Sequence, residues 1–274
     1  MKLYSQFKQH LLTLAAVGFG LGTLAPLPVA AVGFPSSTPS GGAPPRTASG
    51  APRRSEYCAP PLNRDLDNDG VVDELTPMTV LAPTSNVISS ADDRLTLFVY
   101  LPASPANTIE IGLFKQLEGN REKQVYYNDT LKVPPAVRQG PRIAAYTLND
   151  ISLEPGATYI WSLSLICEDS ETWQFAQIGH MEGMVSCEAG CIADQTAHLS
   201  ATTTGQDLLQ TAQRYAEQAL WDDTVYLTAQ LRNTDPAQWQ ALLESQGLGC
   251  FANVPFASDD SDFAIADDPQ CFVD

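Results

Sequence analysis

The sequence predicts a mainly β protein, an antiparallel, immunoglobulin-like β-sandwich followed by a C-terminal α-helical hairpin plus one helix. From Leu75 to about Val185, short runs rich in β-branched and aromatic residues follow one another between Pro, Gly, Asn and Asp. After residue 201 the apolar spacing changes to that of helices. Several consecutive strands without helices between them favour two packed antiparallel sheets.

Length and charge narrow the classes of partner. The 274 residues are 44% hydrophobic, which is enough for a core and for one or two domains. The 32 acidic and 15 basic residues give a formal net charge of -17. Binding to nucleic-acid backbones or to anionic lipid requires clustered Lys and Arg. The charge therefore argues against both of these partners.

Residues 1–31 have the features of a signal peptide. Lys2 and Lys8 precede an uncharged apolar run, Leu11–Leu24, which is shorter than the roughly 20 residues of a membrane span. Val29–Ala31 and Ala31–Gly33 both offer the small-x-small pattern that precedes signal-peptide cleavage. We therefore expect an extracytoplasmic protein, periplasmic or secreted, that does not span a membrane after cleavage.

Residues 32–56 are expected to form a disordered leader. Pro, Ser, Gly, Thr and Ala dominate this stretch and bury too little apolar surface to offset the entropy of ordering. Arg46, Arg53 and Arg54 make it the only locally basic stretch of the mature chain. A solvated linker is the simpler interpretation, and a weak contact to an acidic surface polymer is the alternative.

An acidic segment at residues 57–77 contains the most specific chemical motif. Carboxylates at alternate positions can converge on one hard cation, and Gly70 permits the sharp turn between them. The predicted Ca²⁺ ligands are Asp65, Asp67, Asp69, Val71 through its carbonyl, Asp73 and Glu74. Thr76 replaces the Glu that closes an EF-hand loop, and the motif instead resembles the short extracellular calcium loop called Excalibur. The alternative is an acidic linker that binds no ion.

Residues 78–200 are expected to form the sandwich. The six predicted strands are Leu95–Leu101, Thr108–Phe114, Gln124–Leu131, Arg142–Leu148, Thr158–Cys167 and Trp173–Val185. In the fifth, Tyr159, Trp161, Leu163 and Leu165 fall on one face, with serines opposite. This period of two indicates a strand buried on one side, but the pattern leaves the order of the strands open.

Residues 201–250 are expected to form the helical part. Thr204 and Asp207 have the spacing of a capping box at the start of the first helix. Asp222 or Asp223 is expected to cap the second helix. Since three short helices cannot bury their own apolar faces, we expect them to pack on the sandwich or on a partner.

The third helix and the tail complete the chain. Asp235 followed by Pro236 has the form of a helix start, and Gly247 is a natural stop. Residues 251–274 are predicted to be an acidic tail that serves solvation.

All six cysteines follow the predicted signal peptide. An even number in an exported protein favours disulfide bonds over free thiols. The pairing that we expect is Cys58–Cys167, Cys187–Cys191 and Cys250–Cys271.

No catalytic residue can be nominated from the sequence. It has no GxSxG elbow, P-loop, HExxH or dinucleotide fingerprint. His180 and His198 are the only histidines left after removal of the signal peptide. A hydrolase that uses a pair of carboxylates is the enzyme hypothesis that stays open.

Several segments, in their order, carry a family resemblance. They are Met78–Asn86 (MTVLAPTSN), Leu95–Pro102 (LTLFVYLP), Leu153–Cys167 (LEPGATYIWSLSLIC), Glu182-Gly183 and Tyr215–Leu248. Together they resemble a cyanobacterial family, domain of unknown function 928 (DUF928), over roughly residues 45–250. After Glu182-Gly183 the chain departs from the family pattern, with Met184–Cys187 in place of Trp, an aliphatic residue and Arg.

The resemblance implies an exported protein with no established activity, in which Trp161, Cys167 and Trp221 belong to the scaffold. The leading hypothesis is a non-enzymatic module that binds or scaffolds an envelope protein or a surface polysaccharide. One alternative is a calcium-dependent carbohydrate-binding protein, which needs exposed rings near the acidic loop, such as Tyr57, Trp173 or Phe175. The other alternative is the hydrolase.

Overall fold

The computed structural model describes residues 31–35, 76–119, 121–148, 150–169, 174–187 and 204–257, with the backbone alone at 167–169 and 174–183. Contacts divide the chain into two units, Met1–Ala30 and Ala31–Asp274, and all described residues belong to the second. Residues 1–30 of the predicted signal peptide, the calcium-like loop and residues 258–274 of the predicted tail lie outside this description. The prediction of a solvated tail from residue 251 is wrong at its start, because Phe251, Val254 and Phe256 are buried in the core.

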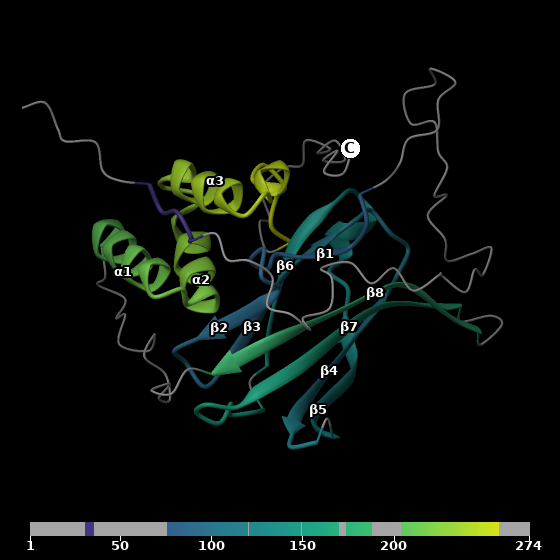
Figure 1. Cartoon of the computed structure of the whole chain (residues 1–274). Helices are drawn as coiled ribbons and strands as arrows, with labels where there is room; N and C mark the ends of the chain where they lie inside the picture. The colour runs from purple at the N-terminus through teal and green to yellow at the C-terminus, as the bar shows by residue number, and fades with distance from the viewer. Residues whose placement is uncertain are drawn as a thin grey trace, which may run out of the picture. The chain divides into compact units, whose positions relative to one another are not determined.

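Two sheets form the β part of the molecule (Figure 1). The three-stranded sheet has the order β1 (Thr79–Val80), β3 (Leu95–Leu101), β6 (Arg142–Leu148). The five-stranded sheet has the order β2 (Val87–Ser90), β8 (Gln174–Cys187), β7 (Thr158–Asp169), β4 (Thr108–Leu117), β5 (Arg121–Lys132). A single-turn helix, η1 (Pro135–Arg138), precedes β6. The predicted mainly β fold with a helical C-terminal part is therefore confirmed, whereas its immunoglobulin-like character stays a prediction.

Strand β2 departs from the predicted antiparallel arrangement. It runs parallel to β8, with Val87 opposite Met184 and Ser90 opposite Cys187, whereas the other strand pairings are antiparallel. A parallel pair cannot be joined by a tight turn and needs a long connection. Here the connection is the whole chain between β2 and β8, which the periodicity of a four-residue strand does not reveal. The prediction of an entirely antiparallel sandwich is wrong at this edge.

The apolar face predicted for β7 is confirmed, because Tyr159, Trp161, Leu163 and Leu165 are buried on it. Of the two serines on the opposite face, Ser162 is half-buried and Ser164 is 7% exposed, so the predicted alternation is only partly present. The four apolar side chains belong to the same core as those of β3 and the helices. The five-stranded sheet therefore has one face in the core.

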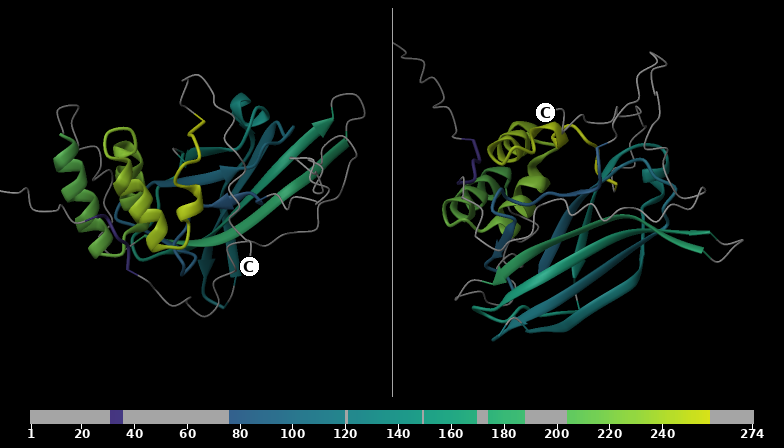
Figure 2. Two further views of the ribbon diagram at one scale, coloured as in Figure 1. Left: turned by 90° about the horizontal axis from the view of Figure 1, so that it is seen from above. Right: turned by 45° about the vertical axis from the view of Figure 1, so that its right-hand side comes forward.

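Strand β3 is buried along its whole length. Phe98 and Tyr100 point to the helical side, where the Phe98 ring centroid lies 6.5 Å from that of Trp239. The Tyr100 ring lies 4.8 Å from that of Phe251, in the single-turn helix η3 (Gly249–Phe251). Leu97 and Val99 point to the opposite face and are fully buried. The three-stranded sheet is thus covered on both faces, and α1–α3 lie together on one side of the β part (Figure 2).

The three predicted helices are present as α1 (Gly205–Glu217), α2 (Trp221–Leu231) and α3 (Pro236–Ser245). The capping box is confirmed, because the Asp207 N–H donates to Thr204 Oγ1 and the Thr204 N–H donates to Asp207 Oδ2. Helix α3 begins at the predicted Pro236, and Gly247 follows its end with φ +68°. Helix α2 packs against α1 and α3 and also against β2 and β3. None of the helices in the described part of the chain is long and apolar enough to cross a membrane.

The segment Ala31–Pro35 corrects the predicted leader at its beginning. Val32 is fully buried and Phe34 is 7% exposed, and both belong to the main core. Although Gly and Pro surround them, two large apolar side chains spaced two residues apart can occupy one groove. The prediction of disorder from residue 32 is therefore wrong for residues 32–35.

Candidate functional site

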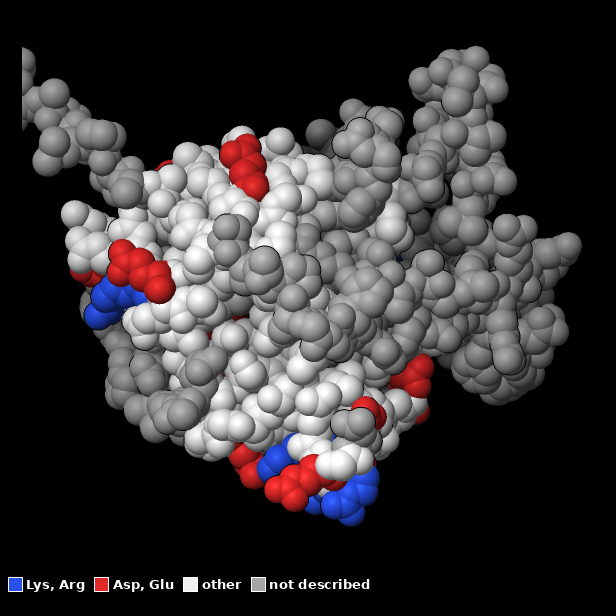
Figure 3. All heavy atoms as spheres, viewed as in Figure 1, with Lys and Arg blue, Asp and Glu red and all other residues white. Residues whose placement is uncertain are grey.

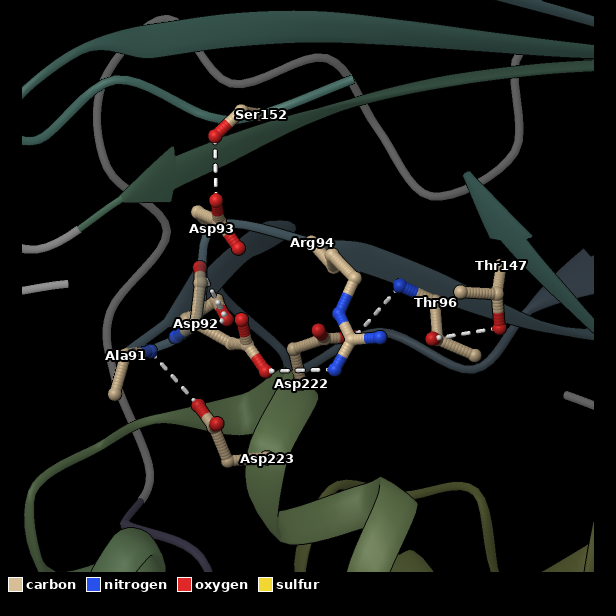
Figure 4. A network of polar contacts seen from close by, with 10 residues as sticks. Ala91, Asp92, Asp93, Arg94, Thr96, Thr147, Ser152, Asp222 and Asp223 are labelled. Atoms are coloured by element: carbon tan, nitrogen blue, oxygen red, sulfur yellow. Dashed lines mark hydrogen bonds and ion pairs between the residues drawn. The ribbon is translucent and has the colours of Figure 1, made fainter. Parts of the chain in front are cut away.

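A small polar pocket lies between the start of α2 and the β2–β3 connection (Figure 4). Its volume is about 70 Å³, and it is lined by Asp92, Arg94, Thr96, Thr147, Asp222, Asp223 and Tyr226. These residues come from three segments that are far apart in the sequence. The pocket therefore brings together three carboxylates, one guanidinium group and three hydroxyl groups.

The helix start explains why two aspartates point into this pocket. Helix α2 begins at Trp221, its N-cap residue is Leu220, and no side chain caps it. Asp222 and Asp223 occupy the first turn, where the helix dipole favours negative charge. Their carboxylates reach out of the helix instead of capping it. The prediction that one of them caps α2 is therefore wrong.

Each carboxylate accepts a backbone N–H from the β layer. Asp223 Oδ2 accepts from Ala91 at 2.8 Å, and Asp222 Oδ1 accepts from Thr96 at 3.2 Å. Both of these N–H groups belong to β3 or to the connection that precedes it. Without the two aspartates they would be buried without a partner, which costs about 1–3 kcal/mol for each group. The pair therefore latches α2 to the β2–β3 corner.

Burial dominates the electrostatics of the pair. It raises the pKa of Asp222 well above its usual range, and the neighbouring charge of Asp223 adds to this shift. Burial likewise raises the pKa of Asp223 to about 6, although the hydrogen bond from Ala91 opposes the shift. Asp223 Oδ1 has no hydrogen-bond partner among the described residues. A nearby positive charge belongs to Arg94, whose Nη2 lies 3.7 Å from Asp92 Oδ2.

The dimensions of the pocket limit its chemistry. Pockets that hold small organic molecules usually have volumes of about 300–1,000 Å³. A cavity of about 70 Å³ has room for a few water molecules. Asp222 and Asp223 both line the pocket, where a hydrolase would need a pair of carboxylates, but each already accepts a backbone N–H group. We therefore assign this pocket to the latch rather than to a substrate.

The exposed edge of the five-stranded sheet is the second candidate. Strand β5 is the last strand in the sheet order, nine of its 12 residues are exposed and none is buried. Four large apolar side chains are exposed in the described part of the chain, and three of them lie on the β4–β5 hairpin. These three are Leu117 (39% exposed), Val125 (38%) and Tyr127 (48%). The fourth, Tyr226, belongs to α2.

Charged side chains gather at the end of β5 that adjoins the β4–β5 turn. Lys115, Glu118, Arg121, Glu122 and Lys123 surround the β4–β5 turn. In Figure 3, basic and acidic side chains gather at the lower end of the molecule, where this turn lies. The stretch from Gln124 to Asn128 carries no charge. Charges at the ends of an edge strand discourage unspecific pairing, whereas an uncharged middle leaves N–H and C=O groups accessible.

Tyr127 is held in place on this edge. Its hydroxyl donates a hydrogen bond to Glu110 Oε1 on the neighbouring strand β4. This hydrogen bond, aided by partial desolvation, raises the pKa of Tyr127 to about 12. An exposed ring with a fixed orientation loses little entropy on binding, which is a property of binding surfaces.

The structure does not describe the residues that the sequence nominated as ligands. Asp65, Asp67, Asp69, Val71, Asp73 and Glu74 all lie outside the described residues. Of the three rings considered for carbohydrate binding, Tyr57 and Trp173 lie outside as well, and Phe175 is described only by its backbone. Within the described ranges, no group of three or more His, Cys, Asp or Glu residues is arranged to hold a metal ion.

The sequence predicts the buried scaffold residues better than it predicts the residues of the pocket. Trp161 and Trp221 are buried, as the family resemblance implied. Asp222 and Asp223 were singled out, but for another role. Asp92 and Arg94 were missed, because their short polar stretch has no spacing that distinguishes it from an ordinary turn. The edge position of β5 depends on the strand order, which periodicity does not encode.

Cysteine pairing is described only in part. Cys187 and Cys250 are disulfide-bonded. The side chains of the other four cysteines lie outside the described residues, so the predicted connectivity stays a prediction.

Comparison with known proteins identifies a family. A family model described as Domain of Unknown Function (DUF928) matches residues 53–256. No curated protein and no solved structure matches the chain.

Proposed function

The chain belongs to the DUF928 family, and from that premise we propose that it is an exported, non-enzymatic module that binds a protein of the cell envelope through strand β5. The observation that carries this proposal is the concentration of exposed apolar side chains on the β4–β5 hairpin, at a sheet edge with which no further described strand pairs. An extended segment of a partner can add to such an edge, where main-chain hydrogen bonds supply affinity. Side chains beside the edge, here Val125 and Tyr127, supply specificity.

The rest of the molecule supports a scaffolding role. The buried aspartates of the pocket bind backbone N–H groups and hold α2 against the β layer. Strand β5 belongs to a sheet that has one of its two faces packed into the core. Rigid presentation of an edge lowers the entropy cost of binding. The predicted signal peptide would place this edge outside the cytoplasm.

Charging the middle of β5 is expected to abolish binding. The mature chain and its Val125→Lys/Tyr127→Lys double variant are each immobilised and exposed to envelope extract from the organism that encodes the chain. A partner protein is expected to be retained by the mature chain and reduced at least tenfold by the double variant, because two new ammonium groups would flank the added strand. Quantitative mass spectrometry of the retained proteins measures the difference.

Tyr226→Lys is the matched control. Tyr226 is exposed to 40%, much like the two hairpin residues, but it lies on α2. This variant is expected to retain the same partner as the unaltered chain. Equal retention by all three proteins contradicts the proposal, as does recovery of a polysaccharide without any protein. Self-association that the double variant abolishes would make a second copy of the chain the occupant of the edge and overturn the envelope partner.

We also propose that the loop Asp65–Glu74 binds Ca²⁺, for which its alternating carboxylates and Gly70 are the support. Millimolar CaCl₂ is expected to raise the melting temperature of the mature chain, because a ligand that binds only the folded state stabilises it. The shift should disappear in Asp67→Ala. Differential scanning calorimetry with and without EDTA measures it.

A second acidic position separates specific binding from bulk charge. Asp260→Ala removes one carboxylate from the tail, where we expect solvation alone. It should retain the full calcium-dependent shift. A melting temperature of the unaltered chain that does not respond to millimolar Ca²⁺ removes the loop as a calcium site.

A further inference from the structure

The segment Ala31–Pro35 is tied to helices that lie more than 200 residues away in the sequence. The Val32 N–H donates to Gln238 Oε1 at 2.9 Å, a buried contact across 206 residues. The Phe34 N–H donates to Ser245 Oγ at 3.0 Å, and the Phe34 carbonyl accepts from Gln246 Nε2 at 3.0 Å. Every polar backbone contact of this segment thus ends on α3 or its C-cap.

The apolar contacts are equally specific. The Phe34 ring packs edge-on against Trp221, with the ring centroids 5.0 Å apart. Gln246 is fully buried, and its Oε1 accepts the Thr84 N–H at 3.0 Å. One glutamine therefore joins the N-terminal segment, the end of α3 and the β1–β2 connection. The segment is a built part of the helical layer, as Figure 1 shows by its course beside α2 and α3.

These contacts distinguish between the two cleavage positions that the sequence leaves open. Cleavage after Gly33 would release Val32, a fully buried core residue, and leave Gln238 Oε1 without its buried partner. Cleavage after Ala31 would retain every contact of the segment. Ala31 itself is exposed, so its loss removes nothing from the core.

We propose that export processing cuts the chain between Ala31 and Val32, and that the new amino terminus of Val32 stays bound at Gln238 as an anchor of the mature protein. The proposal rests on the proposed export. An endopeptidase hydrolyses the Ala31–Val32 amide with one water molecule. Ala31 leaves with a carboxylate, and the Val32 nitrogen becomes an ammonium group.

The surroundings of Val32 suit this ammonium group. An α-amino group has a pKa of about 8 and is charged at neutral pH, so that burial requires acceptors. Gln238 Oε1 is one acceptor, and the Gln238 amide is oriented by its own donation from Nε2 to Asp235 Oδ2 at 3.2 Å. The Asp235 carboxylate thus lies one amide group away from the positive charge. The other two protons of the ammonium group would point toward the position that Ala31 occupies before cleavage. Because Ala31 is exposed, water can reach this position.

The burial of the segment also fixes the order of events. A protease needs an extended, accessible stretch on both sides of the bond that it cuts. With Val32 fully buried and bonded to α3, the docked segment does not offer one. Cleavage therefore precedes docking, and docking completes the fold only after the leader is gone.

The first test locates the cut. The protein is recovered from the exported fraction of its own cells, and its first residues are determined by N-terminal sequencing and intact mass. The expected start is Val32-Gly33-Phe34. An exported protein that begins at Phe34 or later overturns the inference and leaves the proposed export intact. A full-length chain retained in the cytoplasm overturns the export and the cleavage together.

The second test examines the anchor independently of export. In a mature chain whose first residue is set to Val32 with a removable tag, Gln238→Leu removes the acceptor. Its α-amine should react at least tenfold faster with an amine-labelling reagent at neutral pH, as read by mass spectrometry. Gln240→Leu, on the exposed face of the same helix, is the matched control and should react like the unaltered chain. Equal labelling rates in all three chains overturn the anchor.

Discussion

Replacing Trp221 by Ala should lower the free energy of unfolding by about 3–5 kcal/mol, the range for a fully buried Trp. The side chain is 1% exposed, and its Nε1–H donates to the Leu81 carbonyl at 2.8 Å. Its ring also supports Phe34 of the N-terminal segment. The substitution leaves a cavity, an unpaired buried carbonyl and a loosened segment, three separate losses. Since domains are stable by about 5–15 kcal/mol, the variant should be close to unfolding.

Two companion variants separate these losses. Trp221→Phe keeps an aromatic ring against Phe34 but removes the N–H donor, and it should lose less than Trp221→Ala. Tyr226→Ala, at a 40% exposed position of the same helix, should lose less than about 1 kcal/mol. Urea unfolding followed by tryptophan fluorescence and circular dichroism measures all three. A loss below about 1 kcal/mol for Trp221→Ala would show that this residue does not hold the helical layer.

Stability should rise as the pH falls from 7 to 5, and Asp223→Asn should remove much of this dependence. The folded-state pKa of Asp223 is raised from its ordinary 3.8 to about 6, chiefly by burial. A raised pKa means that the neutral acid favours the fold. The resulting stability is fully present below about pH 4 and is lost as the pH rises through about 6. At pH 7, the buried charge therefore costs the fold about 2–3 kcal/mol, because one pKa unit corresponds to about 1.4 kcal/mol.

Asparagine resembles the neutral acid and keeps an acceptor for the Ala91 N–H. At pH 7 the variant should therefore be more stable than the unaltered chain, and this difference should become smaller as the pH falls to 5. Asp222 titrates in the same direction, while Asp92 and Arg94 also face Asp223 across the pocket. A residual slope in the variant is thus expected from Asp222. Unfolding free energies from urea titrations at pH 5, 6 and 7 measure the difference.

The opposite behaviour is expected of an exposed aspartate on α1. Hydrogen bonds from Thr204 lower the pKa of Asp207, so that its ionised form favours the fold. Asp207→Asn should lower stability throughout the pH range from 5 to 7. If Asp223→Asn behaves in the same way as Asp207→Asn, the ionised carboxylate of Asp223 stabilises the folded state, and the raised pKa that we attribute to its burial is wrong.

Much of the fold follows from local patterns. The limits of β3 and β6 coincide with their apolar runs, because turn residues stand on both sides of each run. The start of α1 follows from Thr204 and Asp207, whose hydrogen bonds are local, and the start of α3 follows from Pro236. Alternation in β7 identified the buried face, because a sheet with one face in a core imposes that period.

What the patterns missed depends on contacts between distant segments. Residues 87–90 are too few to show a period, and their parallel partner lies almost a hundred residues further along the chain. Val32 and Phe34 are buried only because α2 and α3 supply a groove for them. Asp222 and Asp223 have the sequence pattern of helix caps, but their carboxylates accept the backbone N–H groups of Ala91 and Thr96 instead of those of the helix. The edge position of β5 could likewise not be predicted, because the order of strands in a sheet depends on pairing between distant segments.

The parallel pairing of β2 with β8 has a consequence for the route by which the molecule folds. The β4–β5 hairpin joins neighbouring stretches, and β7 and β8 pair next to each other, so that both need only short loops to close. Val87 can pair with Met184 only after the chain between these two residues has become compact. Since closure of long loops slows folding, we expect β2 to join last, on a sheet that is already assembled. Until β2 has joined, β8 is an edge strand whose backbone N–H and C=O groups are exposed. Incorrect pairing of another strand with this edge is therefore the step at which misassembly would begin.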